Sequence, residues 1–304
     1  MRDPFRIEGP ALINLSLGRS SSYMLDRIRA AHGGHLPADV HVVFANVGRE
    51  REETLRFGAD IAERWGIHLR WLERDGSRPA GARFREVEYE TASRRGEPFE
   101  ELIAERRYLP NPVARFCTAD LKILVARDFM RAQGYDHWTS VVGLRRDEPD
   151  RVAKLRARDH GEWDIACPLY DARVTKGDVL AFWRAQDFDL ALGPNESNCD
   201  GCFLRSVAHR QRVAEERPDL LEWWATMEER VGARFRKDGP SYRQLLDGAR
   251  SQMRLPLAPA DVADDLAVCG CTDRRLRRCT CGKRPGRGHA LHCARVLGDE
   301  RRAA

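Results

Sequence analysis

Apolar residues recur along the first half of the chain in two alternating rhythms. Four short β-branched and apolar runs, typical of buried strands, occupy residues 11–17, 40–48, 67–73 and 136–144. Amphipathic patterns with helical spacing lie between them, at residues 21–31, 49–66 and 119–134. Strands that alternate with helices in this way predict an α/β fold, in which a parallel sheet has helices on both faces.

The rest of the chain divides into less regular segments. Residues 74–116 are rich in Arg, Glu and Gly and are interpreted as an insertion or lid over one sheet edge. Residues 145–155 read as a loop, whereas residues 174–186 and 208–232 have helical patterns. We therefore expect a nucleotide-binding α/β domain at 1–195, a helical region at 196–272 and a tail at 273–304, which begins beyond a change of composition near Ala258.

Composition limits the cellular setting. No apolar run approaches the roughly 20 residues of a membrane helix, and the N-terminus, MRDPFRIEGP, lacks the apolar stretch of a secretory signal. We therefore expect a cytoplasmic protein with no membrane partner. In that reducing compartment, nine cysteines, several of them closely paired, favour metal or cluster ligation over disulfides.

The net charge of +5 is unevenly distributed. Residues 273–304 hold ten Lys and Arg against three acids, a charge of +7, which leaves −2 on the other 272 residues. Such a tail is typical of an arm that binds DNA or RNA, or else of a solvated terminus. It also contains Cys279, Cys281, His289, His292 and Cys293, which could form a small Zn²⁺ site or be incidental.

Three polar loops follow predicted strands, and the carboxyl ends of parallel strands meet at one rim of a sheet. Residues 16–22 are small and precede a helix, so their backbone N–H groups can hold an anion. Residues 143–151 carry three arginines suited to bidentate phosphate contacts. Asn46, at the end of the second strand, faces the same rim.

These loops resemble those of a known superfamily. SLGRSS (16–21) is similar to the phosphate loop of the PP-loop nucleotide α-hydrolases. FANVGREREETLRF (44–57), PVARFCTADLKI (112–123), VVGLRRDEPDRV (141–152) and CDGC (199–202) resemble the phosphoadenosine phosphosulfate reductase branch. The likeness covers about residues 11–273 in the right order, and it implies a Rossmann-like PP-loop fold that binds an adenine nucleotide.

The resemblance implies roles for individual residues. It suggests ATP with Mg²⁺ as the bound nucleotide and places two arginines, Arg145 and Arg146, near the α-phosphate as catalytic groups. The implied nucleotide-binding residues are Ser16, Gly18, Arg19, Ser20, Ser21, Asn46, Gly143 and Arg151. One departure is Leu17, where the related loops have glycine. We expect a bulky side chain there to narrow the approach to the phosphates.

The same resemblance suggests a [4Fe–4S] cluster. A Cys-x-x-Cys turn lets two thiolates reach one metal centre, and cluster-bearing relatives add a cysteine at the position of Cys117. We assign Cys117, Cys199, Cys202 and Cys271 as ligands; Cys269, or a position left open for sulfide, are alternatives for the fourth. The alternatives to the cluster are a Zn²⁺ ion bound by the same residues and cysteines that remain free thiols.

Three functions follow from these residues. The first is an ATP-dependent enzyme that adenylates a target or transfers sulfur, acting on a nucleic acid. The second is a sulfonucleotide reductase, although AVCGCTD (267–273) lacks the Glu and His that flank the catalytic cysteine of the thioredoxin-linked enzymes. The third is a nucleic-acid-binding protein with a vestigial nucleotide site, motivated by Leu17.

Overall fold

The computed structural model describes residues 3–193 and 196–251. Residues 1–252 form one compact unit, and none of the helices within the described ranges is long and apolar enough to cross a membrane. The predicted fourth cysteine ligand, Cys271, and the predicted zinc site of the tail lie outside these ranges. The predicted domain boundary near residue 195 stays a prediction.

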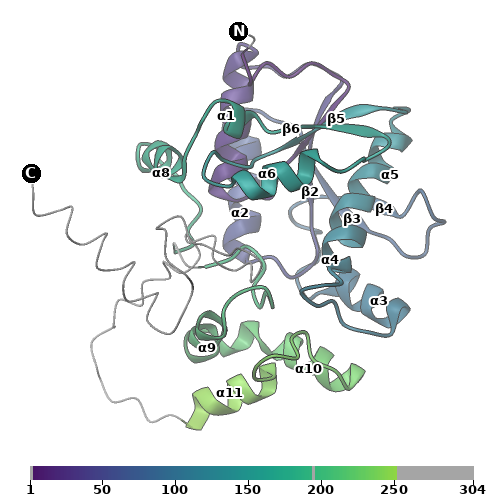
Figure 1. Ribbon diagram of the computed structural model, residues 1–304, viewed down its shortest axis with the longest axis vertical. Coiled ribbons are helices and arrows are strands. Elements are labelled where there is room, and N and C mark those ends of the chain that lie inside the picture. Colours follow the sequence, from purple (N-terminus) through teal and green to yellow (C-terminus); the bar gives the residue numbers. More distant parts are fainter. Residues whose placement is uncertain (1–2, 194–195, 252–304) are drawn as a thin grey trace, which may run out of the picture. The chain divides into compact units, whose positions relative to one another are not determined.

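A six-stranded sheet forms the centre of the fold, with strand order β4-β3-β2-β1-β5-β6 (Figure 1). Neighbouring strands run parallel, except that β4 pairs antiparallel with β3 at one edge. The strands are β1 (Ala11–Asn14), β2 (Val40–Ala45), β3 (Leu69–Arg74), β4 (Phe84–Val87), β5 (Trp138–Val142) and β6 (Trp163–Ala166). The predicted α/β class, a Rossmann-like parallel sheet, is confirmed.

One face of the sheet is covered continuously. Three helices lie on this side: α1 (Arg19–Ala31), α2 (Glu52–Trp65) and α8 (Lys176–Arg184). Alternate strand residues such as Ala11, Ile13 and Val42 join their apolar faces in one large core. Helix α2 ends where Gly66 adopts the left-handed conformation at its C-cap, as the sequence predicts.

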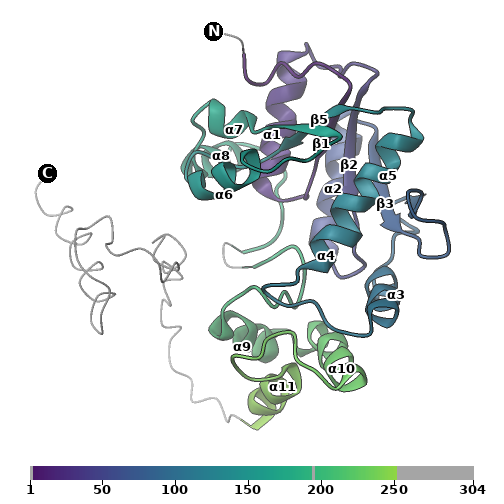
Figure 2. The ribbon, with the colours of Figure 1, turned by 45° about the vertical axis from the view of Figure 1, so that its right-hand side comes forward.

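The other face is covered in two separate pieces. Helix α5 (Leu124–Ala132) packs on β2, β3 and β4 around Phe129 and Val43. Helix α6 (Pro149–Arg156) packs on a smaller core around Leu144 and Cys167. In Figures 1 and 2, α6 lies to the left and α5 to the right, with strands of the sheet visible between them.

A fourth core, apart from the three of the sheet, joins α3 (Glu97–Arg106) to the last described helices. Phe99, Leu121, Phe203 and Trp224 belong to it. The helices are α9 (Val207–Glu216), α10 (Glu222–Val231) and α11 (Tyr242–Ser251), with the short turn η2 (Pro218–Leu220) between the first two. They lie at the bottom of Figures 1 and 2.

Several segments differ from the sequence-based expectation. Residues 145–155, predicted as a loop, contain α6, because Pro149 fits the first turn of a helix and Val152 is buried beneath it. Strand β6 was not predicted; it is four residues long and follows a loop. The expected insertion at 74–116 holds the edge strand β4 and α3. The short α4 (Phe116–Thr118) and α7 (Pro168–Asp171) were not predicted either.

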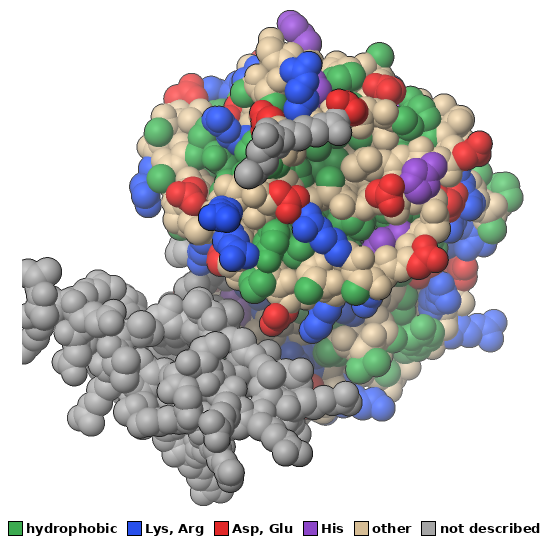
Figure 3. All heavy atoms as spheres, turned by 45° about the horizontal axis from the view of Figure 1, so that its top comes forward, with side chains coloured by type: hydrophobic (Ala, Val, Ile, Leu, Met, Phe, Trp, Pro, Cys, Tyr) green, Lys and Arg blue, Asp and Glu red, His purple; other side chains and the backbone are tan. Residues whose placement is uncertain are grey.

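Charged side chains cover much of the outer surface as mixed pairs. On the face seen in Figure 3, basic and acidic side chains are interspersed. Arg64 with Asp187 and Arg131 with Glu162 are examples of exposed ion pairs, which contribute little stability each in water.

Candidate functional site

The phosphate loop lies between β1 and α1. Gly18 is the N-cap of α1, no side chain caps this end, and the first turn contains no acid. The N–H of Ser22 bonds the Gly18 carbonyl, which leaves the preceding N–H groups free to bind an anion. Ser21 holds the loop closed, because its hydroxyl bonds the Gly18 carbonyl at 3.0 Å and lies 3.0 Å from the Ser16 hydroxyl.

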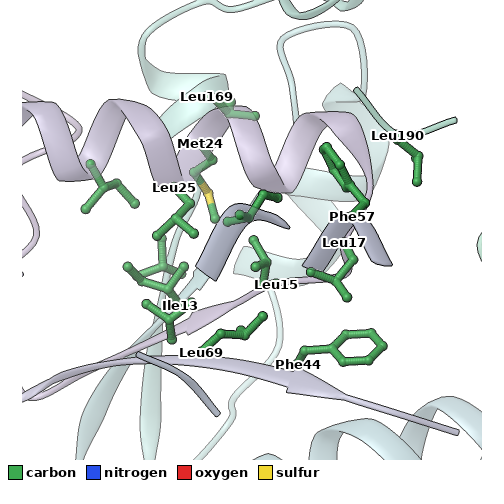
Figure 4. Packing of buried hydrophobic residues seen from close by; sticks show 14 of the residues in the cluster. Ile13, Leu15, Leu17, Met24, Leu25, Phe44, Phe57, Leu69, Leu169 and Leu190 are labelled. Carbon is green, nitrogen blue, oxygen red and sulfur yellow. The ribbon is translucent and has the colours of Figure 1, made fainter. Parts of the chain in front are cut away.

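Leu17 points away from this loop and into the core. Its φ is +53°, a left-handed conformation that favours glycine. The side chain is fully buried near Phe57 (Figure 4). It fills the space above Gly58, where an added Cβ would lie 2.6 Å from Leu17 Cδ1. The expectation that this leucine narrows the approach to the phosphates is therefore wrong: the backbone keeps the glycine-like shape, and the side chain packs on the opposite side.

Two other segments touch the loop. A Cβ at Gly143, just beyond β5, would lie 3.0 Å from the Ser21 Cα, so a side chain there would require the loop to shift by a few tenths of an ångström. The Asn198 side chain donates to the Ser16 carbonyl at 2.6 Å. Asn198 precedes the CDGC motif, and its position beside Cys199 is the one sequence signal that could have identified it.

The arginines that the sequence singled out have different surroundings. Arg145 donates to the Ser20 hydroxyl at 2.8 Å and pairs with Asp147 and Glu148, so it lies at the loop. Arg151 pairs with Glu148 and, like Arg145, lines a large cavity beside the loop.

Two further predicted arginines bind elsewhere. Arg146 donates to the Tyr170 hydroxyl at 2.9 Å and stacks over that ring. Arg19 forms a two-pronged ion pair with Asp189 and donates to the Leu192 carbonyl at 3.0 Å. Its guanidinium thus ties α1 to the segment after α8, whereas its backbone N–H remains at the helix N-terminus.

Asn46 is buried behind the rim. Its amide donates to Glu73 at 2.7 Å and to the Ser93 carbonyl at 2.8 Å, and it accepts the N–H of Gly48 at 3.0 Å. It does not belong to the cavity lining. Asn46 therefore shapes the loop after β2, and its predicted contact with nucleotide stays a prediction.

Three cysteines gather beside the loop. Cys117 lies in α4, and Cys199 and Cys202 lie in the segment that pairs with the loop after β2 through a bridge between Glu50 and Cys199. Burial raises the pKa of the Cys117 thiol, and the nearby Cys202 raises it further. Burial, then Glu50 and then Cys202, raise the pKa of Cys199 well above its usual value. The charge of Cys202 thus acts on both of the other thiols.

The donor set suits a thiolate-bound cluster. Cys117, Cys199 and Cys202 are half-buried, and the first two pack against one apolar core. Soft thiolates are the ligands of iron–sulfur centres. Within residues 3–193 and 196–251, no group of three or more Cys, His, Asp or Glu side chains is arranged so that it could hold a metal ion. The assignment of Cys117, Cys199 and Cys202 as ligands therefore stays a prediction, as does the fourth ligand, which lies outside the described part of the chain.

One cation lies beside these thiols. The Lys122 ammonium donates to Glu50 at 2.9 Å, and the Glu50 side chain is 1% exposed. Although burial opposes the charged form, Glu50 raises the pKa of Lys122, and Cys199 and Cys117 add to the effect. Lys122 lies in a π-helical turn (η1, Ala119–Ile123), a rare form that often marks functional sites.

A buried ion pair holds the CDGC turn. Arg49 pairs with Asp200, which also accepts the indole N–H of Trp224 at 2.7 Å. Burial raises the pKa of Asp200 to about 6, an effect that Arg49 opposes. Trp223 stacks over Arg49 at 5.2 Å. Trp224 itself is a core residue, since it is 1% exposed.

Several of these residues line one cavity of about 1180 Å³. The phosphate loop, Arg145, Lys122 and Cys199 line it, together with one face of β1 and β5. The N-terminus of α1 and the Cys199 thiol thus share a single space at the carboxyl ends of the strands, where α/β proteins bind ligands. The fold and this cavity define a Rossmann-like α/β protein.

Comparison with known proteins gives two findings. No family model matches this chain. Over 204 residues, 64% of this chain, it is 30% identical to the uncharacterized nin region protein ORF290 of Escherichia phage lambda, and the match spans 66% of that protein, just under two thirds.

Among solved structures, the fold is similar to that of the U34-tRNA thiolase NcsA from Methanococcus maripaludis with its [4Fe-4S] cluster. The likeness has a TM-score of 0.40 and 14% identity, and covers 87% of this chain and 80% of that chain. A likeness at this level carries no conclusion about the present chain, and membership of the phosphoadenosine phosphosulfate reductase family stays a prediction.

Proposed function

We propose that this protein is an ATP-dependent enzyme that activates an acceptor by adenylation, with sulfur transfer as the subsequent use of the activated group. One observation carries the proposal. The Asn198 amide bonds the Ser16 carbonyl, so the phosphate loop and the CDGC turn are held together in one cavity. The resemblance of both motifs to PP-loop enzymes supports the same reading.

The chemistry assigns work to residues of this chain. The free N–H groups at the start of α1 and the Arg145 guanidinium would bind the α-phosphate and stabilise negative charge as it builds there. An acceptor oxygen attacks the α-phosphorus, the bond from that phosphorus to the bridging oxygen breaks, and pyrophosphate leaves. Mg²⁺ would screen the departing phosphates.

Cys117, Cys199 and Cys202 would hold the proposed cluster, with Cys271 as the proposed fourth ligand. When bound, such a cluster supplies an iron site that can carry sulfide or an electron. Lys122, beside two of these thiols, would balance the negative charge of the ligated thiolates. The proposed acceptor class is a nucleic acid.

Pyrophosphate release tests the nucleotide part. Wild-type protein with Mg²⁺ and ATP should bind ATP and release pyrophosphate in the presence of acceptor. Gly18→Val should abolish both, because a branched side chain at the N-cap blocks the anion site. Release of sulfite from a sulfonucleotide with a thiol reductant would instead establish the reductase. If the protein binds no nucleotide at millimolar concentration, the remaining function is a nucleic-acid-binding protein with a vestigial nucleotide site. The residue that suggested this function, Leu17, lies in the core.

Anaerobic purification tests the cluster. We expect brown protein that contains iron and acid-labile sulfide, with a broad thiolate-to-iron absorption band. Cys199→Ala should remove the band and most of the iron. Cys167→Ala is the matched control, since Cys167 is fully buried in the separate core beneath α6. Colourless protein with stoichiometric zinc would contradict the cluster.

A further inference from the structure

The cavity extends beyond the phosphate loop, along the sheet face between α5 and α6. This face has two separate cores, one beneath each helix, and the space between them is open. Its floor is polar at the centre: the Asn14 amide donates to the Ser140 hydroxyl at 2.8 Å. Polar side chains at the middle of a central strand pair are unusual for a sheet face that is packed dry.

Aromatic rings border the far end of this groove. Trp138 and Trp163 stack with ring centroids 5.5 Å apart, and His160 stacks on Trp163 at 5.6 Å. All three line the cavity, and His160 and Trp163 are half-exposed. The indole N–H of Trp138 is buried and has no hydrogen-bond partner among the described residues. A solvent-facing ladder of rings is the arrangement on which nucleobases stack.

The walls of the cavity are strongly basic. Its carboxylates are Glu50, Glu148, Asp189 and Glu196, and each is engaged by Lys or Arg. Lysines and arginines outnumber them in the lining. The net field inside the cavity is therefore positive, even though the chain outside the tail carries −2.

Two of these cations lie next to the ring ladder. Lys154 and Arg158 come from α6 and the turn after it, are exposed, and line the cavity. Neither has an acidic partner among the described residues. Cations that are free in this way can exchange counterions for phosphates.

The ring ladder is remote from the phosphate loop. Trp138 and Trp163 begin β5 and β6, whereas the loop lies at the carboxyl ends of the strands. The length of β5 separates the two by about 13 Å, at roughly 3.3 Å per residue. The ladder thus offers a second subsite, in the same groove as the first.

We propose that this groove binds a single-stranded segment of nucleic acid, with its phosphates on Lys154 and Arg158 and an unpaired base stacked on the His160–Trp163 ladder. The inference rests on the proposed function, in which this strand is the acceptor that is led along the sheet to the phosphate loop. A duplex would keep its base faces covered, so the ladder selects an unpaired strand.

Fluorescence anisotropy with a labelled, unstructured oligonucleotide, as RNA and as DNA, tests the groove in the full-length chain. The double variant Lys154→Ala/Arg158→Ala should bind roughly tenfold more weakly, and its salt slope should fall by about 1.4, since each contact to a single strand contributes about 0.7. The matched control is Arg95→Ala/Lys237→Ala, which removes two exposed cations that lie outside the cavity lining. The control should bind as wild type does.

Trp163→Ala should weaken binding by about fivefold or more, and Trp163→Phe should retain most of it, because a smaller ring still stacks. Ultraviolet cross-linking should place the oligonucleotide on the peptide that contains residues 159–163. Equal affinities for wild type and the Lys154/Arg158 double variant would overturn the proposal, as would a loss of ATP affinity in Trp163→Ala, which would make the ladder an adenine site. If wild type binds no ATP but these differences persist, the proposed function fails and the groove stands.

Discussion

At the scale of single residues, Leu17 shows how a departure from a motif can be absorbed by packing. Related loops have glycine here, and the structure keeps the left-handed backbone with φ of +53°. A leucine in that conformation carries a strain of about 1–2 kcal/mol. Its side chain offsets the strain by filling the space above Gly58.

Leu17→Gly should therefore destabilise the protein and leave ATP binding unchanged. Loss of a buried leucine lowers the free energy of unfolding by about 2–5 kcal/mol. Glycine removes the strain of the left-handed backbone, which raises it by about 1–2 kcal/mol. We expect a net loss of about 2 kcal/mol in the free energy of unfolding, measured by urea denaturation. Titration calorimetry measures the affinity of the variant for ATP. Tighter ATP binding in the variant would show that the side chain does obstruct the phosphates.

His41 makes the stability of the folded protein depend on pH through its local surroundings. Burial, followed by the charge of Arg70, lowers its pKa below the usual 6.5. The unfolded chain therefore takes up a proton at this ring before the folded protein does. Its contribution to stability is full above pH 6.5 and is lost as the pH falls from there through the folded pKa.

His41→Gln should flatten the loss of stability between about pH 7 and pH 5. Denaturation curves across this range give the slope directly. His35→Gln is the control, because His35 is exposed and the curve should keep its wild-type slope. An unchanged slope in the His41 variant would mean that other groups carry the acid sensitivity.

At the scale of elements, the site depends on how closely the end of β5 approaches the start of α1. Gly143 allows this contact, since an added Cβ would lie 3.0 Å from the Ser21 Cα. Gly143→Ala should push the phosphate loop out of position and weaken ATP binding by roughly tenfold, about 1.4 kcal/mol. Isothermal calorimetry measures the change.

Gly248→Ala is the matched control for this substitution. Gly248 lies in α11 and its Cβ would meet nothing within 4 Å, so the variant should bind ATP as wild type does and gain slight helix stability. Normal ATP affinity in Gly143→Ala would show that the loop can shift without loss of the anion site.

At the scale of the whole molecule, charge is distributed over two places that a polyanion could use. The tail carries +7, and the groove gathers cations from α6 and from the segment around Lys122. Truncation after Thr272 keeps Cys271 and should leave ATP affinity intact. It should weaken, but not abolish, oligonucleotide binding.

Adding Lys154→Ala/Arg158→Ala to the truncated chain should remove most of the remaining affinity. Anisotropy titrations at two salt concentrations compare four proteins: wild type, the truncated chain, the Lys154/Arg158 double variant and the truncated double variant. If truncation alone removes all binding, the tail is the sole nucleic-acid element; if truncation changes nothing, the tail has no part in binding.

The α/β class and four of the strands could be predicted because buried strands and amphipathic helices leave strong periodic patterns. Helix α6 was missed because half of its residues, PDRVAKLR, are charged and Val152 is its one fully buried residue. Strand β6 was missed because four residues hold too few alternations to distinguish a strand from a loop. Both elements form the wall and part of the floor of the groove.

The sequence by itself determined which residues have the chemistry: the small polar loop after β1, the arginines near residue 145, and the cysteines at 117, 199 and 202. Tertiary structure alone decided their partners. It turned Leu17 into the core, bound Arg19 to Asp189 and Arg146 to Tyr170, buried Asn46, and joined Asn198 to the phosphate loop. It also gathered cations from distant segments into one cavity of a body whose net charge is −2. Net charge is a sum over the sequence, whereas a binding field depends on which side chains folding brings together.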